Sequence, residues 1–234
     1  MNFTRFARPR PLATESLPST RELFFLAGAQ YSMLLFSVFT PSIVTLIVIE
    51  RLGPVANAHY YLPALITSGL ALFNWSIVRS FIVEAAHEPY ALRRHANTAM
   101  RGLALVLIPS VVIGVIFAPE FLRIFGRAYA ANGTTLLRML LLALPLSAVT
   151  IFYTAFAWLD KRVWWMAIRE LVSAAIYFTI LLSLISRHGI IAIGIASLVS
   201  SGLQGIFFLP ISIRRYRQTS NTDPPATTPD LAAT

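Results

Sequence analysis

Long runs of apolar residues, separated by short polar segments, dominate the sequence. Each run is close to the roughly 20 residues that an α-helix needs to cross the hydrocarbon core of a bilayer. The runs occupy residues 27–49, 58–83, 102–118, 135–158, 163–185 and 190–211. They are continuous rather than alternating with a period of two, as the strands of a membrane barrel would be. The pattern predicts an all-α, multi-pass membrane protein with one bundle of six transmembrane helices.

Polar segments flank the predicted bundle, which we place at residues 25–213. Residues 1–24 are rich in arginine and proline and lack the early apolar stretch of a cleaved signal peptide. We expect them to form a polar cytoplasmic N-terminal segment. Residues 214–234 are polar and rich in proline after the first few arginines, and this composition predicts a disordered cytoplasmic tail.

Two connectors between the runs are longer than tight hairpins. Residues 84–101 are polar and predict a separate polar helix. In residues 119–134, aromatic and leucine side chains recur at helical spacing beside two arginines, which is typical of a helix lying in the membrane interface. The pair Asn132 and Gly133 predicts a turn into the fourth span.

The composition indicates that lipid surrounds much of the protein. Hydrophobic residues make up 56% of the chain and charged residues 12%, about half the charged share of a soluble domain. The net charge of +9 would suggest nucleic acid in a soluble chain. With both termini in the cytoplasm, however, most basic residues lie on the cytoplasmic side, as the positive-inside rule requires. The residues left outside are Arg51, Arg123, Arg127 and Arg187. We therefore expect both termini to be cytoplasmic and nucleic acid not to be a partner.

Enzymatic motifs are missing from the sequence. The chain has no cysteine, so it has no disulfide and no thiolate metal site. Its four histidines are isolated, with no HExxH motif, and neither a nucleotide-binding loop nor a nucleophile elbow occurs. We expect no catalytic residue, no metal and no cofactor. An embedded glycosyl- or acyltransferase is the least favoured interpretation.

Three arginines, Arg79, Arg138 and Arg169, lie within predicted spans. A charge in hydrocarbon costs at least a few kcal/mol, so such residues usually face a cavity or a partner. We predict them as substrate-binding residues. The alternative for Arg79 and Arg169 is that the long side chain extends to the cytoplasmic interface. The alternative for Arg138 is an anchor at the outer interface.

Two acidic residues within or bordering the spans, Glu84 and Glu170, are candidates for ion coupling or gating. Glu84 has a second interpretation, as a residue that ends its helix or anchors the following loop. Glu170 is next to Arg169, and adjacent residues on a helix point about 100° apart. We therefore expect each of the two to find its partner on another helix or in a cavity.

Two segments of the chain resemble a family of transporters. Residues 51–101 begin RLGPVANAHYY, and residues 117–158 begin FAPEFLRIFGRAYAANGTTLLR. Both are similar to bacterial polysaccharide flippases of the multidrug/oligosaccharidyl-lipid/polysaccharide exporter superfamily. Glu84 matches a recurrent EAAH element of that family, and Arg138 matches a recurrent LLR element. The resemblance extends over roughly residues 27–211 and corresponds to the second of the two six-helix bundles of such proteins.

The resemblance implies a transport function. Members of the family flip a lipid-linked oligosaccharide, carried on an isoprenoid diphosphate, across the bacterial cytoplasmic (inner) membrane. Because one bundle is missing here, the chain would be a half-transporter that needs a second six-helix bundle, from a second copy or a separate chain, or else the remnant of a split gene. Its partners would be the lipid bilayer and the lipid-linked oligosaccharide. The alternative is a non-transporting membrane anchor or regulatory subunit of a polysaccharide-assembly complex.

Overall fold

The computed structural model describes residues 20–87, 92–159 and 163–218, and these are helical apart from short turns, with no strand. The predicted all-α class is therefore confirmed. The helices in this part of the chain are α1 (Thr20–Leu52), α2 (Pro54–His87), α3 (Leu92–Ile116), α4 (Ala118–Arg123), α5 (Arg127–Leu159), α6 (Val163–His188) and α7 (Ile191–Gln218). Most of the predicted N-terminal segment, 1–24, and most of the predicted tail, 214–234, lie outside the described residues.

Five of these helices are long and apolar enough to cross a membrane: α2, α3, α5, α6 and α7. This supports the prediction of a multi-pass membrane protein. The remaining predicted span, 27–49, lies within α1, a helix of 33 residues. The structure describes only part of the side chains of α1, and α1 is not among the five. The count of six spans stays a prediction.

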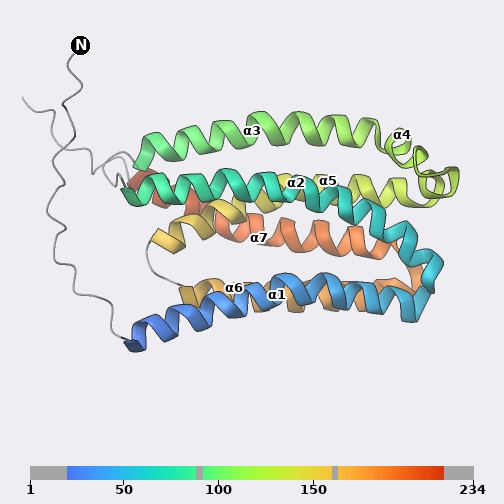
Figure 1. Ribbon diagram of the computed structural model, residues 1–234, viewed down its shortest axis with the longest axis horizontal. Coiled ribbons are helices and arrows are strands. Elements are labelled where there is room, and N and C mark those ends of the chain that lie inside the picture. The colour runs from blue at the N-terminus through green and yellow to red at the C-terminus, as the bar shows by residue number, and fades with distance from the viewer. Residues whose placement is uncertain (1–19, 88–91, 160–162, 219–234) are drawn as a thin grey trace, which may run out of the picture.

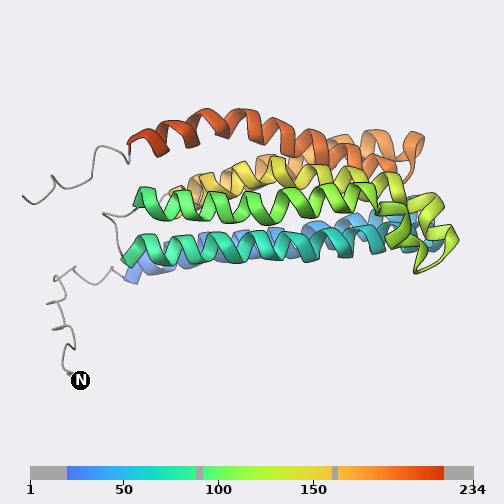
Figure 2. The ribbon, with the colours of Figure 1, turned by 90° about the horizontal axis from the view of Figure 1, so that it is seen from above.

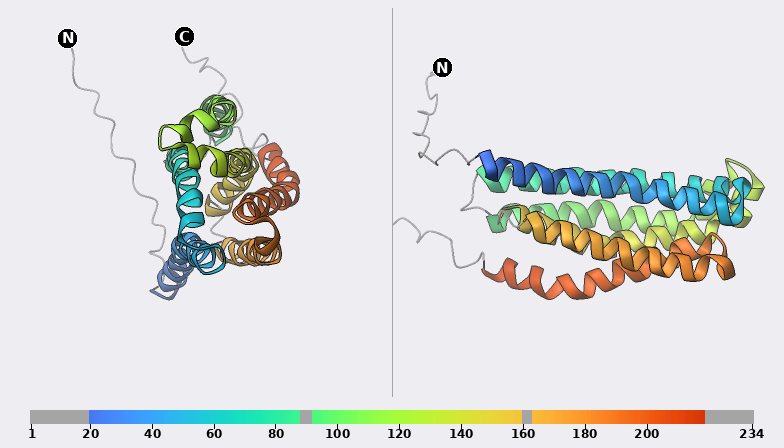
Figure 3. Two further views of the ribbon diagram at one scale, coloured as in Figure 1. Left: turned by 90° about the vertical axis from the view of Figure 1, so that its right-hand side faces the viewer. Right: turned by 90° about the horizontal axis from the view of Figure 1, so that it is seen from below.

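The long helices run side by side along one axis (Figure 1). Viewed from the end, α1, α2, α5, α7 and α6 form a ring in which each helix packs against the next, and α6 packs against α1 to close it (Figure 3). Helix α3 lies outside the ring against α2 and α5. Helix α5 has the most extensive contacts, chiefly with α7 and α2, whereas it touches its sequence neighbour α6 only lightly.

Successive long helices run in opposite directions, so the bundle has two distinct ends. At the terminal end, α1, α3 and α6 begin and α2, α5 and α7 end (Figure 2). At the α4 end, α4 and the α1–α2 and α6–α7 connections occur. The first and last described residues therefore lie at the same end, the arrangement expected when both termini are on one side of a membrane.

The prediction of a separate polar helix at residues 84–101 is wrong. Helix α2 continues to His87, and α3 begins at Leu92. The polar residues of this stretch are mixed with alanine, leucine, arginine and methionine, which are strong helix formers. The two spanning helices therefore extend past their apolar runs.

The connector at residues 119–134 also differs from the prediction. Helix α4 ends at Arg123, and the turn occurs at Gly126, whose φ of 137° suits glycine. Asn132 and Gly133 lie inside α5, so the predicted turn there is wrong. The Asn132 side-chain amide donates to the Ala128 carbonyl at 3.0 Å. A Cβ on Gly133 would lie 3.3 Å from the His59 carbonyl oxygen, so close packing against α2 explains this glycine.

Two buried apolar clusters hold the helices together. The first lies between α2, α3, α4 and α5 and includes Phe81, Leu103, Leu122, Leu137 and Leu141. The second lies between the five ring helices at the α4 end and includes Val48, Tyr60, Leu136, Leu181 and Ile193. Many large apolar side chains on the outer faces of the helices remain exposed. Such an outer surface fits a bundle surrounded by lipid.

Gly194 allows α7 to approach α5, and this position offers a test of the packing. A Cβ on Gly194 would lie 2.8 Å from the Met139 Cβ, which is not the flexible end of its side chain. We expect Gly194→Ala to lower the free energy of unfolding by about 1–3 kcal/mol through overpacking, partly offset by the better helix propensity of alanine. The measurement is thermal unfolding of the purified protein in detergent.

Gly202→Ala is the matched control on the same helix, because nothing lies within 4 Å of a Cβ there. We expect this variant to be neutral, or stabilised by up to about 1 kcal/mol. Equal unfolding midpoints for the two variants would contradict the packing of α5 on α7.

Candidate functional site

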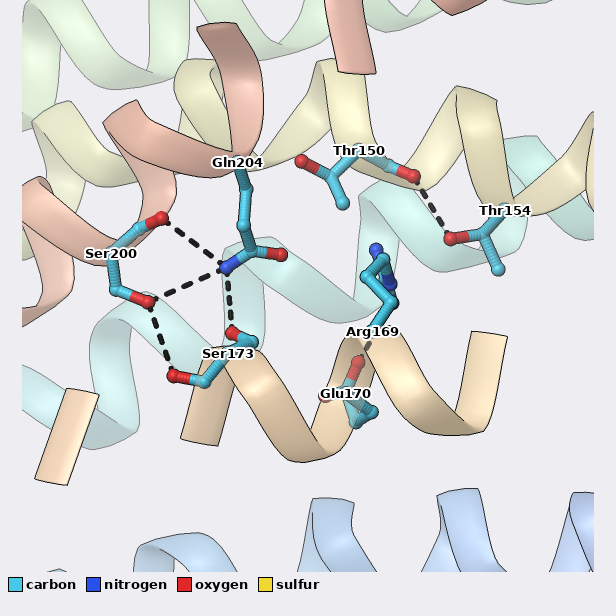
Figure 4. Close-up of polar contacts among 7 residues, drawn as sticks. All are labelled: Thr150, Thr154, Arg169, Glu170, Ser173, Ser200 and Gln204. Atoms are coloured by element: carbon cyan, nitrogen blue, oxygen red, sulfur yellow. Dashed lines mark hydrogen bonds and ion pairs between the residues drawn. The ribbon is translucent and has the colours of Figure 1, made fainter. Parts of the chain in front are cut away.

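Polar side chains gather inside the bundle between α5, α6 and α7 (Figure 4). We call this group the polar cluster. Its members are Thr150 and Thr154 on α5, Arg169, Glu170 and Ser173 on α6, and Ser200 and Gln204 on α7. Along each of these helices, the cluster lies toward the terminal end from the second apolar cluster. The interior is therefore mainly apolar at the α4 end, where Tyr60 and Tyr177 also lie, and it holds the polar cluster nearer the terminal end.

Hydrogen bonds in the cluster join α6 to α7. The Gln204 side-chain amide donates to the Ser173 hydroxyl at 2.6 Å and to the Ser200 carbonyl at 3.3 Å. The Ser200 hydroxyl lies 3.5 Å from the Ser173 carbonyl. Hydrogen bonds between membrane helices contribute about 0.6 kcal/mol each on average. The α6–α7 side of the cluster is therefore a satisfied helix–helix contact.

Arg169 and Glu170 form an ion pair, contrary to the expectation that each would need a partner elsewhere. Arg169 Nη2 lies 2.7 Å from Glu170 Oε2. Adjacent side chains leave a helix about 100° apart, but the side chains of arginine and glutamate are long enough for their ends to meet. The Arg169 side chain is 12% exposed and that of Glu170 is 35% exposed. The guanidinium thus lies within the bundle rather than along its outer surface.

Two buried polar atoms of the cluster have no hydrogen-bond partner within the protein. They are Arg169 Nε and Thr150 Oγ1. In Figure 4, Arg169 points from α6 toward the turn of α5 that carries Thr150 and Thr154. Thr154 is satisfied, because its hydroxyl donates to the Thr150 carbonyl at 2.9 Å. Buried polar groups are normally paired, so Arg169 Nε and Thr150 Oγ1 are exceptions among the polar groups of the cluster.

The other two predicted arginines do not join this cluster. Arg79 is exposed on α2 and takes no part in the contacts described above. Arg138 lies toward the α4 end, where its Nε donates to the Val115 carbonyl at 3.0 Å. Val115 is in the last turn of α3, so this bond satisfies a carbonyl that the helix leaves free. The three arginines therefore do not form one site.

Glu84 joins the end of α2 to the start of α3. Its Oε2 lies 3.1 Å from His95 Nδ1, and the Glu84 side chain is 53% exposed. This contact fits the interpretation of Glu84 as a residue that anchors the following connection. It places Glu84 apart from Glu170, which belongs to the polar cluster.

Sequence reasoning missed the uncharged members of the cluster. Thr150, Ser173, Ser200 and Gln204 are single polar residues within apolar runs and carry no charge that draws notice. Asn74 on α2 is a further case, because it is 1% exposed and its Nδ2 has no partner within the protein. The sequence signal that could have identified these residues is a single polar side chain near the centre of an apolar run.

Comparisons of the chain with protein-family models, with curated proteins and with solved structures find no match. The family resemblance therefore remains an expectation from the sequence, and the functional argument depends on the geometry of the polar cluster.

The contact between Arg138 and Val115 predicts a structural role for this arginine. We expect Arg138→Ala to lower the free energy of unfolding by about 1 kcal/mol, because a carbonyl at the end of α3 loses its donor. Thermal unfolding in detergent measures the change. Arg127→Ala is the control, since Arg127 is exposed at the start of the same helix. A midpoint for Arg138→Ala equal to that of the control would refute the capping role.

Proposed function

We propose that this protein moves a lipid-linked oligosaccharide across the bacterial cytoplasmic membrane, as one bundle of a transporter. The second bundle would come from a second copy or from a separate chain. The observation that carries the proposal is Arg169, a cation inside a bundle of membrane-spanning helices with one donor that has no partner within the protein. Ionisable residues at such positions usually mark the path of a substrate or ion.

The chemistry of the polar cluster supports this class of substrate. The isoprenoid diphosphate carries negative charge, which the Arg169 guanidinium neutralises. The sugar carries hydroxyls, which hydroxyl and amide side chains can hydrogen bond in place of water. The isoprenoid chain stays in the bilayer beside the exposed apolar faces of the helices. Arg79 is available at the bundle surface to an anionic head group or to the second bundle, and Arg138 lies outside this mechanism.

In this proposal the terminal end faces the cytoplasm. Its helices carry Arg93, Arg94 and Arg101 at the start of α3 and three further arginines near the end of α7. Cytoplasmic ends of membrane proteins have such an excess of basic residues. The polar cluster then lies nearer the side on which lipid-linked sugars are assembled.

The second candidate is a membrane anchor or regulatory subunit that does not transport. It is favoured by one observation, the apolar cluster that fills the ring at the α4 end. Cross-linking in membranes separates the two candidates. A dimer, or a cross-linked second chain of similar hydropathy, supports transport by paired bundles, and a strict monomer supports the anchor.

Arg169→Gln is expected to reduce export of the sugar intermediate by about tenfold or more, because charge-assisted hydrogen bonds to the diphosphate are lost. The measurement compares sugar polymer at the cell surface with lipid-linked intermediate inside, in cells that depend on this chain. Membrane insertion should be unchanged on an immunoblot. The control is Arg101→Gln, an exposed arginine on α3. Normal export in Arg169→Gln would contradict the proposed function.

The orientation has its own test, which the absence of native cysteine makes simple. His87 is exposed at the terminal end, and Ser186 is exposed at the α4 end. In intact cells, an impermeant thiol reagent should label Ser186→Cys and should label His87→Cys only after the membrane is opened. The reverse pattern would place the terminal end outside and remove the proposed route of entry.

A further inference from the structure

The contact between Arg169 and Glu170 leaves half of one guanidinium edge unused. Nε and Nη2 lie on the same edge of an arginine and together match two oxygens of a carboxylate or phosphate. Glu170 contacts only Nη2, at 2.7 Å, while Nε has no partner within the protein. The carboxylate is therefore a single-point occupant of a two-point site.

We infer that Glu170 is a displaceable internal occupant of an oxyanion site on Arg169, and that the anionic group of a ligand takes its place. The ligand class is a phosphate or diphosphate ester, and its identity as the head group of a lipid-linked sugar rests on the proposed function. Two oxygens of the incoming group accept from Nε and Nη2 of Arg169. The ion pair with Glu170, which uses one nitrogen of Arg169, is thus exchanged for an ion pair with the ligand that uses two.

The difference in burial between the two side chains favours this exchange. Arg169 is 12% exposed and Glu170 is 35% exposed. A carboxylate that is one third exposed can turn toward water and keep its charge at modest cost, whereas a buried guanidinium without an anion is strongly destabilising. The arginine therefore stays, and the glutamate is the partner that leaves.

The proposed oxyanion site consists of the Arg169 edge alone. Thr150 Oγ1 is also buried without a partner within the protein, but Figure 4 shows this hydroxyl on the Gln204 side of Thr150 and the methyl group on the Arg169 side. Glu170 is the next residue after Arg169 on α6, so its carboxylate meets the guanidinium from their own helix. An oxyanion that reaches the edge formed by Nε and Nη2 gives a partner to the Arg169 atom that the protein leaves unpaired.

Two adjacent substitutions are expected to act in opposite directions. Glu170→Gln removes the competing charge, so the ligand no longer has to displace a carboxylate, and binding becomes tighter. Arg169→Gln removes the site, and binding becomes weaker. If the ion pair served only to hold the fold together, both variants would bind more weakly or unchanged.

The test uses the purified full chain in nanodiscs of zwitterionic lipid, with inorganic diphosphate as the probe and calorimetry as the measurement. We expect Glu170→Gln to bind about tenfold more tightly than the natural protein and Arg169→Gln to bind at least about tenfold more weakly. Glu50→Gln and Arg101→Gln are the matched controls, because both residues are exposed, and both variants should retain the natural affinity.

Unchanged or weaker binding by Glu170→Gln overturns the exchange, and equal loss of binding in Arg101→Gln and Arg169→Gln places the anion elsewhere and overturns it as well. A tighter complex cannot arise from misfolding, so the Glu170 variant keeps the test decisive if Arg169→Gln fails to fold. Tighter binding by Glu170→Gln together with normal export in Arg169→Gln supports the exchange and overturns transport. Lost export in Arg169→Gln together with unchanged affinity in Glu170→Gln supports transport and overturns the exchange.

Discussion

Hydrocarbon offers no hydrogen-bond partner, and this constraint accounts for the position of most polar groups in the bundle. Short hydroxyl side chains meet it locally, as when Thr67 donates to the Pro63 carbonyl at 2.8 Å one turn earlier on α2. Longer side chains meet it across helices, as Gln204 does with Ser173. Arg169 meets it only in part. Thr150 and Asn74 also keep a buried polar atom without a partner within the protein, but Arg169 is the charged member of this set.

The apolar runs predicted the helices well because span length is imposed by the bilayer rather than by tertiary contacts. The helix ends were less predictable. Residues 84–101 read as a separate unit because polarity was taken as the boundary, yet helix propensity extends α2 and α3 beyond the hydrocarbon. Gly133 was taken as a turn residue for a similar reason. Its role, a close approach to α2, depends on His59, which lies 74 residues earlier in the chain.

The site was predictable in part. The cost of burying charge directed attention to the three arginines in the spans, but Arg79 and Arg138 are exposed and only Arg169 lies within the bundle. Arg138 satisfies a carbonyl of α3, 23 residues away, and that partner follows only from the packing of α5 on α3. Arg169 and Glu170 pair because side-chain length outweighs their diverging directions on α6. The pattern of hydrophobic residues predicts neither contact.

The uneven interior of the five-helix ring has a consequence for permeation. Val48, Leu136 and Leu181 are among the buried residues that fill the ring at the α4 end, together with the tyrosines Tyr60 and Tyr177. An anion that enters among α5, α6 and α7 from the terminal end meets the polar cluster first and a mainly apolar, close-packed interior beyond it. In the proposed transporter, the cargo would therefore leave along the flank of the bundle, where another protein surface or the lipid forms the opposite wall.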